Sequence, residues 1–267
     1  MVGALLWRGM LLGVLAGLLC FGFLELAGEG SVEQAIAFES QHEKAETPAP
    51  AHAHPGAAAP KEEPQPELVS REVQAGIGLF VAVTVYSAAF GGFFAVAFAF
   101  AYGRMGDLSP RATAAMLGAL AFVSVYVVPF IKYPPNPPSV GDAETIGMRT
   151  ALYFSMLALS LAAMIGAGML RLRLQPRLGL WNACLAAAAA YLVAVTIVGL
   201  ALPAINEVPE RFPAAVLWNF RLASLGVQLL LCAVFGIGFD LAAERVLANS
   251  SRSPATIAGS PRRVTHS

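Results

Sequence analysis

The chain has 267 residues, of which 57% are hydrophobic and 13% are charged, and its formal net charge at pH 7 is zero. Soluble domains carry roughly 25% charged residues, and the mean hydropathy here is +0.65. This composition excludes a protein whose main solvent is water, and we expect a lipid bilayer around most of the chain. We expect no nucleic-acid partner.

Long runs without a charged residue predict membrane-spanning helices, because a helix needs about 20 apolar residues to cross a bilayer. The runs cover residues 9–24, 73–103, 112–131, 150–170, 178–206 and 222–239. They are continuously apolar and rich in Ala, Leu and Gly, whereas the strands of a membrane barrel alternate. The sequence therefore predicts an all-α, polytopic integral membrane bundle of about six transmembrane helices.

The first run is short, so a cleaved signal peptide with Arg8 as its positive region is one interpretation. The run lengthens to 4–27 if Arg8 and Glu25 reach the two head-group layers. Glycines recur at every fourth position: Gly9, Gly13 and Gly17. Such a stripe suits close helix packing, although it could also face lipid tails. We predict that residues 1–27 form a first transmembrane helix with this glycine zipper.

Residues 28–72 follow as a predicted outer tether, rich in His, Pro, Ala and Glu and disordered, since it has little to bury. Its histidines are His42, His52 and His54, with Glu39, Glu43 and Glu46 nearby. Imidazole and carboxylate groups suit a borderline divalent metal ion. The alternative is a solvated linker in which the histidines are incidental, because ordering a flexible chain around a metal costs entropy.

The bundle is predicted to occupy residues 73–240, with outer loops at 132–149 and 203–221. Its short turns at 103–111 and 171–177 are basic and carry Arg104, Arg111, Arg171, Arg173 and Arg177. Basic residues in short loops mark the cytoplasmic side. Both termini are therefore predicted to be cytoplasmic, with residues 241–267 as a disordered basic tail.

The segment KYPPNPPSVGD interrupts the helical pattern at residues 132–142. Tyr133 is followed by Pro134, Pro135, Pro137 and Pro138, which fix the backbone and remove amide donors. Irregular backbone at membrane depth is tolerated where it lines a cavity or is buried in protein. Together with the side chains of Asn136, Asp142 and Glu144, its oxygens could bind a divalent cation at a mouth. Alternatively, the prolines only end a helix and turn the chain.

The loop at 203–221 ends in an aromatic and basic stretch. Trp218 is predicted to lie in the interfacial aromatic belt. Arg221 begins the last span and needs an anionic partner or a head group. Glu25 is a candidate partner, although both charged side chains could instead reach the interface separately.

Three features together resemble a known family: an arginine before a glycine-zipped first helix, PFIKYPPNPPSVGDAETI after the third span, and ERFPAAVLWNFRLASL before the last. They resemble the CbtA family of predicted cobalt transporter membrane subunits. The resemblance implies cobalt uptake for cobalamin synthesis in a bacterial inner membrane, with a small single-span, histidine-bearing partner, CbtB. It also makes five spans an alternative to six, because family members are often drawn with five.

The leading hypothesis is therefore a permease subunit for divalent cobalt, with nickel as an alternative because both ions accept the same ligands. No phosphate-binding loop is present, and no cofactor is expected. A second hypothesis is a non-transporting scaffold for a metal-binding partner. A membrane-embedded enzyme of cobalamin or lipid metabolism is disfavoured, since the predicted spans contain no histidine for acid-base chemistry.

Overall fold

The computed structural model describes residues 2–46, 69–138 and 140–251, and these ranges contain helices and no strand. The elements in chain order are α1 (Val2–Ala27), α2 (Glu29–Glu46), α3 (Arg71–Val73), the π-helix η1 (Gln74–Gly78), α4 (Leu79–Ala101), α5 (Pro110–Ala121), the π-helix η2 (Phe122–Val127), α6 (Val128–Lys132), the 3₁₀-helix η3 (Ala143–Thr145), α7 (Ile146–Ala201) and α8 (Ala214–Ser251).

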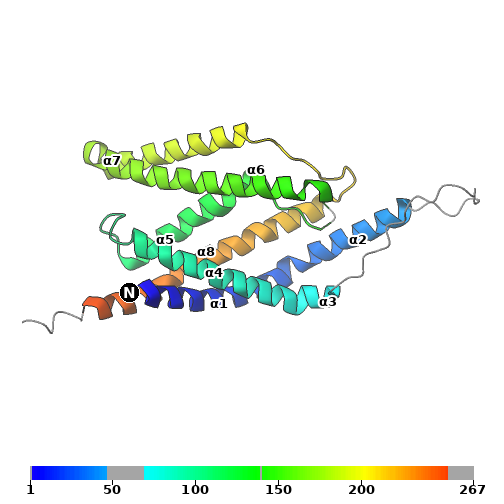
Figure 1. Cartoon of the computed structure of the whole chain (residues 1–267), viewed down its shortest axis with the longest axis horizontal. Helices are drawn as coiled ribbons and strands as arrows, with labels where there is room; N and C mark the ends of the chain where they lie inside the picture. The colour runs from blue at the N-terminus through cyan, green and yellow to red at the C-terminus, as the bar shows by residue number, and fades with distance from the viewer. Residues whose placement is uncertain (1, 47–68, 139, 252–267) are drawn as a thin grey trace, which may run out of the picture.

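Within the described residues, five helices are long and apolar enough to cross a membrane, which confirms the all-α polytopic class. The fourth of them contains α7, which reverses direction at Gly179 (φ 74°, ψ 167°) and runs back along itself (Figure 1). A hydrogen bond of 2.9 Å joins the hydroxyls of Ser160 and Tyr191 on its two arms. Each of the six predicted apolar runs therefore has a helical arm of its own.

The glycine stripe of α1 packs against α4. A Cβ added at Gly13 would lie 2.7 Å from the Cα of Ala88, and one at Gly17 would lie 2.7 Å from the Cα of Thr84. These neighbours are backbone atoms, so no side chain fits between the helices. Small residues allow such close approach where packing, not water, drives association. The stripe thus faces protein rather than lipid.

A column of aromatic rings fills the core between α4 and α8. Ring centroids lie 5.5 Å apart for Phe90 and Phe235, 5.3 Å for Phe94 and Phe235, and 5.0 Å for Phe98 and Phe239. All except Phe90 are buried. Aromatic pairs at these separations gain energy beyond their buried area. The column fills the space where the C-terminal half of α4 faces the C-terminal half of α8.

Two segments predicted to be disordered are partly helical. Residues 29–46 of the expected tether form α2, whose Ala35 and Phe38 pack with Val140, Phe212 and Val216. The apolar residues of this segment recur at helical spacing. The average composition of residues 28–72 did not reveal this periodicity. Residues 47–68 lie outside the described residues.

The predicted basic tail at 241–267 differs in the same way, because α8 continues to Ser251. The sequence DLAAERVLANSS is rich in Ala, Leu, Glu and Arg, which are strong helix formers. Residues 252–267 lie outside the described part. The beginning of α1 and the described end of α8 lie at one end of the bundle, as expected for two termini on one side (Figure 1).

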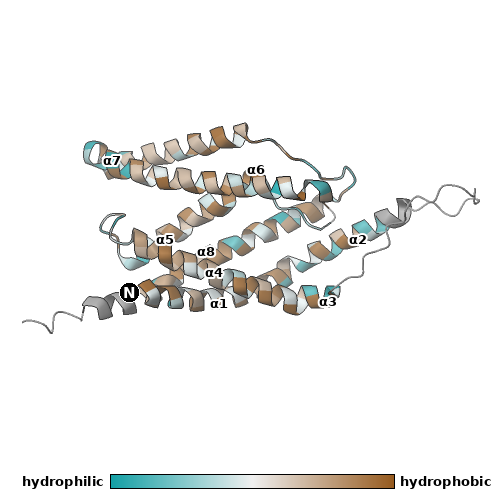
Figure 2. Ribbon diagram, viewed as in Figure 1, coloured by the Kyte–Doolittle hydropathy of each residue, from teal (hydrophilic) through white to brown (hydrophobic). Residues whose placement is uncertain are grey.

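Polar residues gather toward the ends of the bundle, while the helix bodies are mainly apolar (Figure 2). The bend of α7 is the clearest hydrophilic zone. Large apolar side chains on the helix bodies are exposed, including Phe93 at 77% and Trp181 at 75%. This distribution suits helices surrounded by lipid.

Candidate functional site

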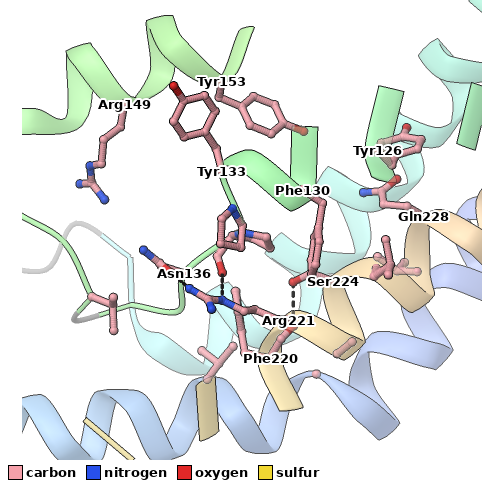
Figure 3. Close-up of a pocket in the computed structure, with 18 of the residues that line it drawn as sticks. Tyr126, Phe130, Tyr133, Asn136, Arg149, Tyr153, Phe220, Arg221, Ser224 and Gln228 are labelled. Atoms are coloured by element: carbon pink, nitrogen blue, oxygen red, sulfur yellow. Dashed lines mark hydrogen bonds between the residues drawn. The ribbon is translucent and has the colours of Figure 1, made fainter. Parts of the chain in front are cut away.

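A cavity of about 820 Å³ opens between the helices at the end that carries the proline segment. Its walls come from the first turns of α7, from η2, α6 and α8, from the end of α1 and the beginnings of α2 and α4, and from the loops at 133–136 and 205–208 (Figure 3). On α8 the lining runs from Phe220 to Gln228, about 12 Å at 1.5 Å per residue. The cavity therefore reaches into the bundle rather than lying on its surface.

The proline segment forms part of the cavity wall, as a non-helical path. Tyr133 ends α6 with φ −131° and ψ 76°, and the following residues adopt no helix. Tyr133, Pro134, Pro135 and Asn136 line the cavity, while Pro137 is buried and Pro138 is exposed. This segment therefore lies beside a cavity between helices, and its role as a mouth for an ion stays a prediction.

Arg221 binds the oxygens that were predicted to be free for a metal ion. Its Nη2 donates to Asn136 Oδ1 at 2.9 Å and its Nε donates to Pro135 O at 3.3 Å (Figure 3). The guanidinium thus occupies a cation position and pins the proline segment to α8. The suggested pairing of Arg221 with Glu25 is not among the described contacts. The Glu25 side chain is exposed, and the Arg221 guanidinium donates instead to the Pro135 carbonyl and the Asn136 amide oxygen.

A second arginine, Arg149 of α7, connects the end of the proline segment to the loop that carries Glu207. Arg149 Nη2 donates to Asp142 O at 2.9 Å, and Arg149 Nε lies 3.3 Å from Glu207 Oε2. The same Glu207 oxygen accepts from the Asp142 N–H at 2.9 Å. The pKa of Glu207 is lowered by the hydroxyl of Thr145 first, then by the Asp142 N–H and the charge of Arg149. The carboxylate therefore acts as the joint between the two loops.

The loops are also joined by a neutral contact, in which Tyr133 OH donates to Pro203 O at 2.7 Å. Burial raises the pKa of Tyr133 above its ordinary value. Trp218 is 63% exposed, as an interfacial residue would be. The rim of the cavity is thus held by hydrogen bonds among three segments that are distant in sequence.

The predicted metal ligands are not gathered in one place. Asn136 lines the cavity, whereas Asp142 and Glu144 are exposed and lie outside the lining. Asp142 Oδ1 accepts from the Glu144 N–H at 2.9 Å and so caps η3. His42 lies in α2, and His52 and His54 lie outside the described residues. Across the described ranges, no group of three or more His, Cys, Asp and Glu side chains could hold a metal ion.

Several cavity residues were missed by sequence reasoning, notably Arg149, Tyr153 and, at the deep end, Tyr126 and Gln228. Gln228 was detectable as a carboxamide within an otherwise apolar run, because polar groups inside spans are costly and mark functional sites. Tyr126 and Tyr153 had no such signal, since aromatic residues are common in membrane helices. Only their position around a shared cavity distinguishes them.

A protein-family model described as "Probable cobalt transporter subunit (CbtA)" matches residues 2–244 of the chain. The chain belongs to the CbtA family. No curated protein and no solved structure matches it.

Two acidic residues and two arginines line the cavity of this CbtA protein. Its charged lining residues are Glu29, Arg149, Glu207 and Arg221. Glu29 forms an ion pair with Arg71 beside the cavity, and Glu207 forms one with Arg149. Both carboxylates of the lining are therefore paired with arginines, and Arg221 adds a positive charge that donates to neutral oxygens. Among the described lining residues no carboxylate is free for a divalent ion, which suits an ion that keeps its water better than one stripped of it.

Proposed function

We propose that this CbtA protein is the permease subunit for uptake of divalent cobalt in the bacterial inner membrane, with cobalamin synthesis as the destination. The family description supports a cobalt transporter subunit. The observation that carries the proposal is the cavity of about 820 Å³ between helices that can span a membrane. The route begins at this cavity, whose proline rim is expected to face outward.

The size and chemistry of the cavity favour entry of a hydrated ion. A divalent ion with about six waters, each of roughly 30 Å³, needs on the order of 200 Å³. The cavity is about 820 Å³ and lacks a carboxylate or imidazole cluster among the described residues. Nitrogen ligands for the ion would come from the small single-span, histidine-bearing CbtB-like partner. Nickel shares these ligand preferences, and competition between the two ions is expected.

The membrane potential can drive such uptake without ATP. Each elementary charge gains about 2.3 kcal/mol per 100 mV on moving inward, so a divalent ion gains about twice that amount. The membrane potential therefore favours the inward movement of a hydrated cation through this subunit.

Blocking the cavity tests the proposal. Thr150 lines the cavity, and Met148, two residues earlier on the same helix, is 53% exposed and does not line it. Thr150→Cys and Met148→Cys are made in a background in which the exposed Cys184 is replaced by Ala; Cys20 and Cys232 are buried. Cells that lack other cobalt carriers express each variant with the partner, and radiolabelled cobalt uptake is measured before and after a bulky, membrane-impermeant thiol reagent.

We expect the reagent to abolish most cobalt uptake through Thr150→Cys and to leave uptake through Met148→Cys unchanged. Tagging of residual thiols shows that both positions have reacted. Full uptake through a completely labelled Thr150→Cys protein would contradict the proposal and would favour the scaffold function, in which the cavity carries nothing.

A further inference from the structure

The deep end of the cavity carries polar groups with unused hydrogen-bonding capacity. Gln228 Oε1 is buried and has no hydrogen-bond partner within the described part of the chain. Tyr126 is 7% exposed, lines the cavity, and shares a hydrogen bond of 2.7 Å with the hydroxyl of Tyr86, which is 48% exposed and lies outside the lining. Figure 3 shows Gln228 and Tyr126 at the same end of the cavity, reaching it from α8 and η2.

These groups are costly at this depth unless something binds them. A buried carboxamide oxygen without a donor loses its hydration, and lipid provides no replacement. In the tyrosine pair one hydroxyl donates to the other, so one O–H proton remains for a further acceptor. Tyr126 lies in a π-helical stretch, Phe122–Val127, and such distortions often occur at functional sites. The deep end thus combines a free acceptor with a spare donor.

The cavity ends at these groups because aromatic rings lie beyond them. The Phe90 ring centroid lies 6.1 Å from that of Tyr126, and Phe90 in turn lies 5.5 Å from Phe235. A hydrated ion that enters the cavity therefore stops at Gln228 and the tyrosine pair until the rings move apart.

We propose that Gln228 and Tyr126 form a binding position for a hydrated divalent cation, where they contact the water shell of the ion rather than the ion itself, while Tyr86 holds the Tyr126 hydroxyl by its hydrogen bond. A metal-bound water is a strong donor, because the ion lowers its pKa, and the free Gln228 oxygen accepts from it. The Tyr126 hydroxyl interacts with a neighbouring water of the shell. Neutral oxygens suffice because the ion keeps its inner ligands. This inference rests on the proposed function for its cargo.

The test uses the purified full-length protein and cobalt(II) chloride alone. Thermal unfolding is measured against cobalt concentration for the unmodified protein, Gln228→Leu, Tyr126→Phe and Ser224→Ala. Ser224 is the matched control: it lies about one turn from Gln228 on α8 and lines the cavity, but its hydroxyl already donates to Phe220 O at 2.8 Å. Ligand that binds only the folded protein raises its melting temperature.

We expect cobalt to raise the melting temperature of the unmodified protein and of Ser224→Ala alike. In Gln228→Leu the cobalt concentration for half of this shift should rise about tenfold, with a smaller rise in Tyr126→Phe. Without cobalt, Gln228→Leu should be at least as stable as the unmodified protein, since an unpaired buried oxygen is removed. Gln228→Glu, which keeps an acceptor, should restore the response.

An unmodified protein without a cobalt response, or an unchanged response in Gln228→Leu, would overturn the binding position. Cobalt uptake in cells separates this result from the proposed function. Uptake that persists while the response is absent refutes only the deep position, whereas a Gln228-dependent response without uptake retains the position and refutes the permease.

Discussion

The packing of α1 on α4 leads to a quantitative prediction for Gly13→Ala. A Cβ at this position would lie 2.7 Å from the Cα of Ala88 and 2.9 Å from the carbonyl carbon of Ser87. Ordinary contacts begin near 3.4 Å, so the helices must separate by roughly 1 Å, and overpacking of this kind costs about 1–3 kcal/mol. Because tight packing is the main force between helices in lipid, the separation weakens contacts along the whole interface.

Thermal unfolding in detergent, followed by tryptophan fluorescence, measures the effect. Gly22→Ala on the same helix is the control, because its added Cβ meets no atom within 4 Å. Both variants gain the same helix propensity, up to about 1 kcal/mol, so their difference isolates the steric cost. At about 2–4 °C per kcal/mol, Gly13→Ala should melt roughly 2–12 °C below Gly22→Ala. Equal melting temperatures would refute the described contact between α1 and α4.

Two further perturbations concern the bend of α7 and the joint between the outer loops. Gly179→Ala should lower stability by about 1–3 kcal/mol in the same assay, because φ 74° with ψ 167° is a conformation that only glycine adopts easily. The control Gly168→Ala should not lower stability, because a Cβ added at Gly168 meets no atom within 4 Å. Equal effects of the two substitutions would contradict the reversal of α7 at Gly179. The pKa of Glu207 is lower in the folded protein than its ordinary value of 4.5. Its carboxylate therefore stabilises the fold at pH values above 4.5, and this stabilisation should be lost as the pH falls through the folded pKa. Glu207→Gln should therefore flatten the acid limb of melting temperature against pH, and an unaltered limb would show that the carboxylate is not the joint.

Much of the architecture is determined locally and is predictable from the sequence. Each span follows from the length of an uncharged run, since backbone groups in lipid must be satisfied within one helix. The non-helical path after Lys132 follows from prolines that lack amide donors. The helix α2 was missed because averaged composition concealed a short stretch of helical periodicity around Ala35.

The ligand environment of the mouth was decided only by tertiary structure. The sequence placed Asn136 at an outer rim but not the Arg221 guanidinium, 85 residues away, that binds its oxygen. Likewise, Gln228 and Tyr126 become one polar end of a cavity only when α8 packs beside η2. Hydropathy is a property of each residue alone, so it predicts the spans from the sequence. Hydrogen-bond partners depend on how the helices rotate and pack against one another, and this packing is the result of many weak contacts between residues that are distant in sequence.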